Sequence, residues 1–235
     1  MAGSERLKPV KAIVFDLDNT LVQSHIDYAR LKSTVLKRLA DAGVPDRLID
    51  SNDSVVENYV RGKAFLMEDS SKPQVIEFDR RLDKALMEIE MERVDQVREI
   101  KGALSLVNSL KENGFKVGIL TRGSRSYATT IMTRTGFDGQ VAHLVCRDDY
   151  PLEEAKPNPL AMERIAQKLG CRSEECVFIG DHPMDLECAK LSGAGFIGVL
   201  TGSTDREKWR LVGCELVIDN ISDVPQLVRR KNTLQ

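Results

Sequence analysis

The chain has 235 residues, 42% of them hydrophobic, and a formal net charge of −2 with a pI of about 6.0. That length and composition allow a full α/β core and a small second domain. The balanced charge argues against nucleic acid or an acidic membrane as the main partner. The longest apolar runs also fall far short of the about 18 residues that span a bilayer.

The amino-terminal segment and the cysteines indicate the compartment. Residues 1–10 are polar and contain no apolar stretch of the kind that a secretory signal needs. The five cysteines are odd in number and lack a Cys-x-x-Cys spacing, which fits reduced thiols better than a disulfide or zinc framework. We therefore expect a cytoplasmic protein.

The first predicted element is a buried strand at residues 12–15 that ends in two carboxylates, Asp16 and Asp18. A parallel strand that is buried on both faces reads as a continuous apolar run, and open α/β sheets place their chemistry at its carboxyl end. If the extended geometry continues through Leu17, both carboxylates leave the same face and enter one crevice. Mg²⁺ prefers such oxygen ligands together with a substrate phosphate.

Other interpretations compete for these carboxylates. An EF-hand loop would need Gly at its sixth position, where Leu21 stands, and is excluded. An ordinary turn rich in Asp and Asn, or a receiver-type signalling domain, is not excluded by the first motif alone.

Residues 24–96 are predicted to be helical and to separate the first strand from the second. Their apolar residues recur at helical spacing on two faces. These faces carry Tyr28, Leu31, Val35 and Leu39, and Phe78, Leu82, Leu86 and Ile89.

Three later segments repeat the pattern of an apolar strand followed by polar residues. The strand predicted at 116–120 runs into Thr121, Arg122 and a glycine before a helix at 124–135, a junction at which backbone N–H groups bind phosphate oxygens. Lys156 precedes a helix predicted at 159–169, which begins with proline. The strand predicted at 176–180 ends in Asp181 and Asp185, a second pair of carboxylates.

The remaining predicted elements are a helix at 102–113 and strands at 143–146, 196–200 and 215–218. Residues 193–198 fit the Gly-x-Gly-x-x-Gly pattern of dinucleotide sites. However, that pattern must follow a strand and open a helix, and here it follows a helix and enters a strand. We expect no dinucleotide site there.

Taken in order, four motifs resemble those of the haloacid dehalogenase superfamily of phosphohydrolases. They are residues 16–20, Thr121, Lys156 and residues 180–185. The resemblance covers nearly the whole chain. It implies a doubly wound parallel-sheet (Rossmann-like) α/β core at 1–22 and 99–235, and an all-helical cap at 23–98 like that of the phosphoglycolate phosphatase and phosphoglucomutase branch.

The resemblance also implies residue roles. Asp16 would be the nucleophile that forms an aspartyl-phosphate, and Asp18 the general acid and base. Thr121, with Arg122 beside it, would bind the phosphoryl oxygens, and Lys156 would stabilise the charge on nucleophile and phosphate.

The metal implied by the resemblance is Mg²⁺. Its ligands would be Asp16, the backbone carbonyl of Asp18, and Asp181, with Asp185 as a ligand or as a partner of the ligands. His182, between the two later carboxylates, could contact substrate, tune Asp181 or cap a helix.

Two positions depart from the family pattern. Asn19 replaces a common Gly, which is tolerated because Asn accepts left-handed turn conformations. Arg122 stands where Asn is frequent, so it either orders the nucleophile loop or reaches a second anionic group on the substrate. Arg30 and Arg61 of the cap are further candidates for pairing with such a group.

The expected function is Mg²⁺-dependent hydrolysis of a small-molecule phosphate monoester through an aspartyl-phosphate. Because the first motif carries both carboxylates, Asp16 and Asp18, the resemblance favours hydrolysis or transfer of a phosphate ester. A phosphoglycolate-like compound is the favoured substrate. The alternatives are a phosphosugar mutase or another phosphotransferase, and, in another class, a phosphate-sensing or partner-binding protein with little turnover. The sequence leaves open whether the protein is a monomer or a homodimer.

Overall fold

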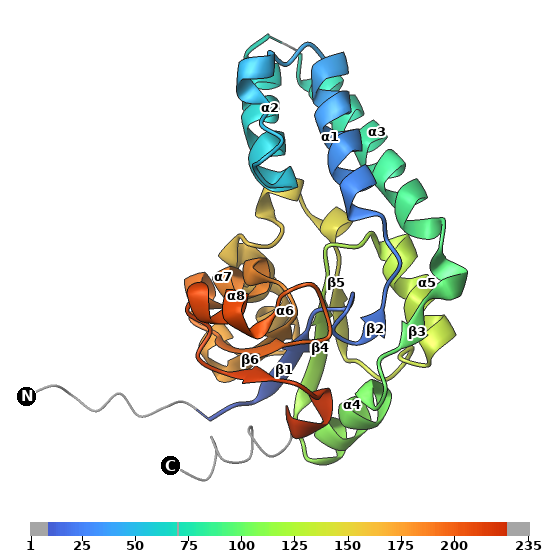
Figure 1. Cartoon of the computed structure of the whole chain (residues 1–235), viewed down its shortest axis with the longest axis vertical. Coiled ribbons are helices and arrows are strands. Elements are labelled where there is room, and N and C mark those ends of the chain that lie inside the picture. Colours follow the sequence, from blue (N-terminus) through green and yellow to red (C-terminus); the bar gives the residue numbers. More distant parts are fainter. Residues whose placement is uncertain (1–8, 70, 225–235) are drawn as a thin grey trace, which may run out of the picture.

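Six parallel strands form the central sheet, in the order β5-β4-β1-β6-β7-β8 (Figure 1). The computed structural model describes residues 9–69 and 71–224. In the sheet, β1 lies between β4 and β6, and Ile13 is opposite Val117 on one side and Val177 on the other. The strands are β1 (Ala12–Phe15), β4 (Lys116–Leu120), β5 (His143–Val145), β6 (Cys176–Gly180), β7 (Gly195–Val199) and β8 (Val217–Ile218).

Helices cover both faces of this sheet, which is why its central strands are apolar throughout. All four residues of β1 are buried, and they alternate between two apolar clusters. Ile13 and Phe15 pack with helices α4 and α5, whereas Ala12 and Val14 pack with α6 and α7. The core helices are α4 (Ala103–Glu112), α5 (Arg125–Thr135), α6 (Pro159–Lys168), α7 (Pro183–Ser192) and α8 (Arg206–Leu211).

The chain order creates a crevice at the carboxyl end of β1. Within the sheet, the chain continues after β1 to β4 and β5 on one side of β1, and then crosses to β6, β7 and β8 on the other side of β1. The loops that follow β1, β4 and β6 therefore diverge around one point. Open α/β sheets bind their ligands at such a topological switch point.

Three helices form an insertion that stands above this edge of the sheet (Figure 1). The short antiparallel strands β2 (Val22–Gln23) and β3 (Arg98–Glu99) pair at its base. Asp27 caps the first helix by accepting a hydrogen bond from the backbone N–H of Arg30 at 2.9 Å. The helices are α1 (Tyr28–Asp41), α2 (Val55–Asp69) and α3 (Lys72–Met91), as the sequence predicts for this stretch.

The insertion has an apolar cluster of its own, to which the core also contributes. Most of the predicted apolar face residues belong to it, including Val35, Leu39 and Leu82. Tyr28 and Ile89 do not: Tyr28 is 52% exposed, and Ile89 is buried outside this cluster. Leu152, from the core loop before α6, packs into the same cluster and attaches the insertion to the core.

The predicted α/β fold is confirmed. The helices and strands predicted for the core all occur, and each end lies within two residues of its predicted position. Gly193, with φ of 75°, ends α7 and leads into β7, so the glycine-rich run enters a strand as predicted. Short 3-10 helices complete the described chain: Asp46–Leu48, Val94–Gln96, Arg147–Asp149, Leu152–Glu154, Ser173–Glu175 and Ile221–Asp223. None of the helices in the described ranges combines the length and apolar character that crossing a membrane requires.

Candidate active site

A cavity of about 470 Å³ opens between the sheet edge and the insertion. Its floor comes from the core and is mostly charged, whereas α1, α2 and α3 contribute apolar side chains from above. The floor includes Asp16, Asp18, Arg122, Arg147, Lys156, Asp181 and Asp185, and the apolar side chains include Leu31, Val55 and Leu86. Each residue predicted from a strand end except Thr121 lines this cavity.

Lys156 lies at the centre of the charged floor. Its Nζ donates to Oδ1 of Asp16 at 2.6 Å and to Oδ1 of Asp185 at 2.7 Å, and all three side chains are buried. Burial by itself lowers the pKa of Lys156, but Asp16 and Asp185 outweigh it and the net shift is upward. Lys156 is therefore a fixed positive charge. Among the described residues, Oδ2 of Asp16 accepts no hydrogen bond.

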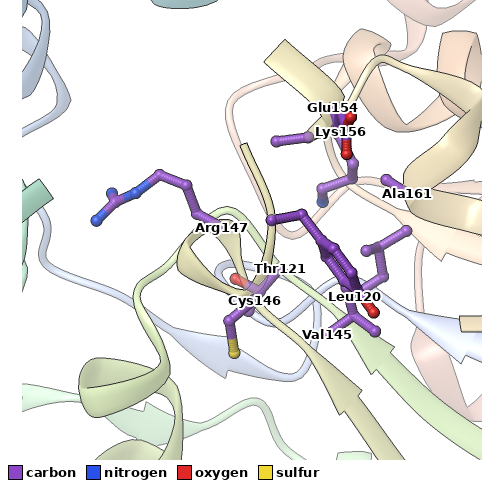
Figure 2. A pocket seen from close by; sticks show the side chains of 10 residues that line it. Leu120, Thr121, Val145, Cys146, Arg147, Glu154, Lys156 and Ala161 are labelled. Carbon is purple, nitrogen blue, oxygen red and sulfur yellow. The ribbon is translucent and has the colours of Figure 1, made fainter. Parts of the chain in front are cut away.

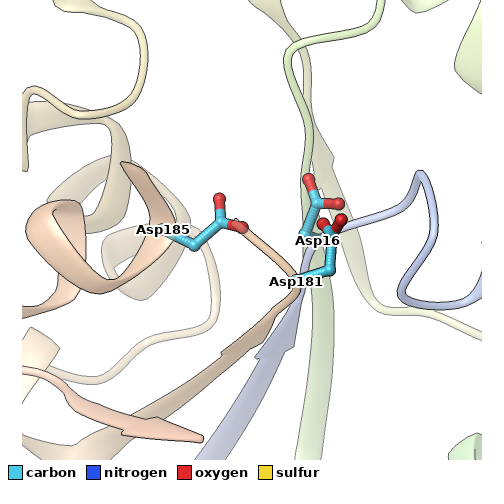
Figure 3. Close-up of side chains that lie close together, drawn as sticks. All are labelled: Asp16, Asp181 and Asp185. Carbon is cyan, nitrogen blue, oxygen red and sulfur yellow. The ribbon is translucent and has the colours of Figure 1, made fainter. Parts of the chain in front are cut away.

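Asp16, Asp181 and Asp185 form a buried carboxylate cluster, with one oxygen of each within 4.8 Å of the others (Figure 3). Burial, and then repulsion by Asp185, raises the pKa of Asp181 to about 7. Burial also raises the pKa of Asp16, against the opposing effect of Lys156.

Three buried carboxylates share one lysine, so the cluster lacks positive charge. A hard divalent cation with oxygen ligands would supply it, and this donor set therefore fits Mg²⁺. The side chain of Asp18 is not part of the cluster.

Asp18 is held by a tyrosine of the core. Tyr127, on α5, donates from its hydroxyl to Oδ1 of Asp18 at 2.6 Å. Burial raises the pKa of Asp18 to about 6, although the Tyr127 hydrogen bond opposes the change. Asn19 follows with φ of 58°, a left-handed turn conformation that Asn accepts. The turn directs the chain from β1 toward the insertion.

The loop after β4 is closed by its own hydrogen bonds. Oγ1 of Thr121 accepts from the N–H of Gly123 at 3.0 Å, which leaves the hydroxyl proton free to donate. Thr121 and Lys156 face a small cavity of about 10 Å³, about the space of one water molecule (Figure 2). Ser124 caps α5 by accepting from the N–H of Tyr127 at 3.4 Å.

A buried ion pair joins the insertion to this loop. Glu90 of α3 accepts from Nη1 of Arg147 at 2.6 Å, and its other oxygen accepts from the N–H of Ser124 at 3.0 Å. Glu90 and Arg147 are 3% and 4% exposed. One glutamate therefore links α3, the start of α5 and the loop after β5.

The three predicted arginines have different positions. Arg122 lines the cavity, and its Nη1 contacts Sδ of Met184 at 3.4 Å. Arg30 pairs with Glu92 at 2.6 Å, and Arg61 pairs with Asp53 at 2.7 Å. Neither of these two lines the cavity.

His182 has a structural contact that accounts for its position. Its Nδ1 accepts from the N–H of Met184 at 3.2 Å, and its own N–H donates to Asp185 at 3.2 Å, so it caps α7. This is one of the alternatives left open by the sequence. The imidazole also lines the cavity, and burial lowers its pKa.

Sequence reasoning missed Tyr127, Glu90 and Arg147, although two of them carry a signal. Arg147 directly follows the strand predicted at 143–146 and thus obeys the rule that identified the other site residues. Glu90 lies four residues after Leu86, which lies four after Leu82, so it is a charge on an apolar helix face. The contact of Tyr127 with Asp18 depends on how α5 packs and has no local signature.

Comparison with known proteins agrees with this geometry. The family model of haloacid dehalogenase-like hydrolases matches residues 10–193. The chain belongs to this family. Within the hydrolase, the matched range includes all the carboxylates and the lysine of the charged floor.

Relatives and solved structures extend over most of the hydrolase. It is 26% identical over 227 residues to a phosphoglycolate phosphatase of Colwellia psychrerythraea, covering 93% of this chain and 97% of that protein. It is 28% identical over 197 residues to a phosphoglycolate phosphatase of Xanthomonas campestris, covering 82% and 84%. These relatives support a phosphatase enzyme.

Two crystal structures share the fold of the hydrolase. A hydrolase from Pseudomonas syringae superposes with a TM-score of 0.66 at 22% identity, covering 94% of this chain and 99% of that one. A predicted phosphoglycolate phosphatase from Haemophilus somnus gives a TM-score of 0.61 at 19% identity, with the same coverage.

Proposed function

We propose that this hydrolase is a Mg²⁺-dependent phosphatase that cleaves a small-molecule phosphate monoester through an aspartyl-phosphate on Asp16. The observation that carries the proposal is the contact of Lys156 with both Asp16 and Asp185 inside a buried carboxylate cluster. The lysine places positive charge where an anionic carboxylate must approach an anionic phosphate. Such reactions are accelerated mainly by positioning and by neutralising charge on the phosphoryl oxygens.

In the first step, Oδ2 of Asp16 attacks phosphorus and the bond to the leaving oxygen breaks. Asp16 is oriented for this because Lys156 holds its other oxygen at 2.6 Å. The hydroxyl of Thr121 would bind a phosphoryl oxygen, together with the backbone N–H of Arg122, because the N–H groups of Gly123 and Ser124 already donate within the protein. The leaving oxygen needs a proton in the same step.

Asp18 supplies that proton in the proposal. Its pKa of about 6 keeps an appreciable protonated fraction near neutral pH, which an ordinary Asp would lack. After the leaving group departs, the Asp18 carboxylate takes a proton from water. The water then attacks phosphorus, releases inorganic phosphate and regenerates Asp16. A general acid of this kind contributes about 10² to 10⁴ in rate.

Asp16, Asp181, Asp185 and the backbone carbonyl of Asp18 are the proposed groups around Mg²⁺. When bound, the cation supplies the positive charge that the carboxylate cluster lacks and neutralises charge on the phosphoryl group. The choice of Mg²⁺ rests on the all-oxygen donor set.

Residues 23–98 are proposed to act as a cap over the core formed by 1–22 and 99–235. A cap excludes water and completes the site, so substrate selection belongs to the cavity between the two parts. By analogy with the relatives named phosphoglycolate phosphatase, a small carboxylated phosphate ester is the favoured substrate.

The test is turnover of an aryl phosphate by the intact chain, with and without Mg²⁺, beside the Asp16→Asn variant. We expect Mg²⁺-dependent release of inorganic phosphate that the variant loses almost completely while keeping the circular dichroism of the parent. Phosphate transfer to a sugar in preference to water would instead favour a mutase. Absence of turnover in the parent would favour a phosphate-binding protein.

A further inference from the structure

Two arginines of the cavity have donors that the protein itself leaves unused. Arg122 follows β4 and Arg147 follows β5, and the N–H of Arg147 donates to the carbonyl of Gly123 at 3.2 Å. This hydrogen bond places the two arginine-bearing loops side by side. Both side chains line the cavity that also holds Asp16 and Lys156.

Arg147 is buried but only partly satisfied. Nη1 donates to Glu90, and Nε lies 3.3 Å from Oδ1 of Asp83 without making a hydrogen bond, whereas Nη2 has no partner at all among the described residues. Figure 2 shows its side chain extending away from Lys156 and Ala161. A buried donor without a partner is costly, so a ligand acceptor at Nη2 would be strongly favoured.

The guanidinium group of Arg122 has even fewer hydrogen-bond and ion-pair partners than that of Arg147. Within the described ranges it forms no ion pair with a carboxylate, its Nε is buried without a partner, and its one hydrogen bond goes to a sulfur. Burial, and then the positive charge of Arg147, lowers the pKa of Arg122 to about 10. Arg147 thus has two carboxylates beside it, those of Glu90 and Asp83, whereas Arg122 has none within ion-pair distance among the described residues.

We propose that Arg122 and Arg147 form a second anion site, which binds a carboxylate carried by the substrate while its phosphoryl group lies at Asp16. The guanidinium fork matches a carboxylate with two parallel hydrogen bonds. This inference rests on the proposed phosphatase function and makes it narrower. It assigns recognition of the second acidic group of such a phosphate monoester to two core loops rather than to Arg30 or Arg61 of the insertion.

The test compares phosphoglycolate with ethyl phosphate, which lacks the carboxylate, on the intact chain with Mg²⁺. The informative variant is Arg147→Lys, because a lysine keeps the positive charge beside Glu90 but removes the fork. We expect the ratio of kcat/KM for phosphoglycolate to kcat/KM for ethyl phosphate to be about 10- to 100-fold lower in Arg147→Lys than in the parent, mostly because KM for phosphoglycolate rises. Arg122→Lys should shift the same ratio in the same direction.

Arg125→Lys is the matched control. Arg125 lies on α5, pairs with Asp149 at the surface and does not line the cavity. The change should leave the ratio and the activity unaltered. If Arg147→Lys lowered both substrates equally, Arg147 would serve only to hold the insertion and the second anion site would be refuted. A parent that prefers ethyl phosphate would refute it too.

Calorimetric titration separates this inference from the proposed function. Phosphoglycolate should bind the Mg²⁺-loaded parent more tightly than ethyl phosphate does, and Arg147→Lys should remove the difference. Aryl phosphate turnover without that binding difference would overturn the second anion site and leave the phosphatase proposal standing. The binding difference without any turnover would support the site and refute the phosphatase.

Discussion

Replacing Gly202 by alanine should weaken Mg²⁺ binding although Gly202 itself carries no ligand. A Cβ at this position would lie 1.8 Å from Oδ2 and 2.5 Å from Cγ of Asp181. Real Cβ atoms essentially never approach closer than 3.0 Å, so the carboxylate must move by about 1 Å or more. Metal sites tolerate errors of only about 0.2 Å in ligand distance.

The expected loss follows from that displacement. Moving groups that orient a metal ligand typically costs about 10- to 100-fold in metal affinity, and we expect Gly202→Ala to lie in this range. Mg²⁺ affinity is measured by calorimetry and by the Mg²⁺ dependence of aryl phosphate turnover. Near-ultraviolet circular dichroism checks that the fold is kept.

A double-mutant cycle with Asp181→Ala locates the effect. If Gly202→Ala acts by pushing the Asp181 carboxylate aside, it should cost little further affinity once that carboxylate is gone. Equal losses in the two backgrounds, or an unchanged Kd in the single variant, would refute the reasoning.

Three further predictions concern protons. Asp18→Asn should slow ethyl phosphate more than an aryl phosphate, because a good leaving group needs less protonation; equal loss on both would argue against Asp18 as the acid. Tyr127→Phe removes the hydrogen-bond donor that stabilises charged Asp18, so the pKa of Asp18 should rise above about 6. The alkaline limb of the pH profile of kcat/KM for ethyl phosphate should then move to higher pH; a limb that stays in place contradicts this. Asp181 has a pKa of about 7 in the metal-free folded protein, above the usual 3.8 of the unfolded chain. Between pH 3.8 and about 7 the folded state therefore binds more protons at Asp181 than the unfolded state does, and the free energy of unfolding without metal should fall as pH rises through this range. Mg²⁺ bound at the proposed site would displace this proton, so its affinity should fall by about tenfold per pH unit below 7, and its effect on Tm should be larger at pH 8 than at pH 5; a pH-independent Kd would be incompatible.

The charged floor of the cavity was predictable because its geometry follows from strand ends. Asp16, Lys156 and Asp181 each adjoin a recognisable strand or helix, and parallel strands bring such residues to one edge of the sheet. No side-chain contact had to be foreseen. The order of the strands and helices along the chain is enough to predict that these side chains meet at one edge of the sheet.

The arginines show where sequence reasoning stopped. Charge and position in the insertion make Arg30 and Arg61 candidates from the sequence, but both pair with acidic neighbours outside the cavity. Arg147 was missed although it follows a predicted strand. Its pairing with Glu90 depends on how the insertion docks, which local patterns do not encode.

The packing of Leu152 bears on how this protein could be recombined with its relatives. Leu152 and Ala155 lie in the loop that carries Lys156, yet both pack against the apolar cluster of α1, α2 and α3. A chimaera that exchanges the helices alone would separate that loop from its packing partners and disturb Lys156. The exchangeable unit is therefore discontinuous in the sequence: the segment at 150–156 must travel with the helices for the transplanted enzyme to keep its lysine in place.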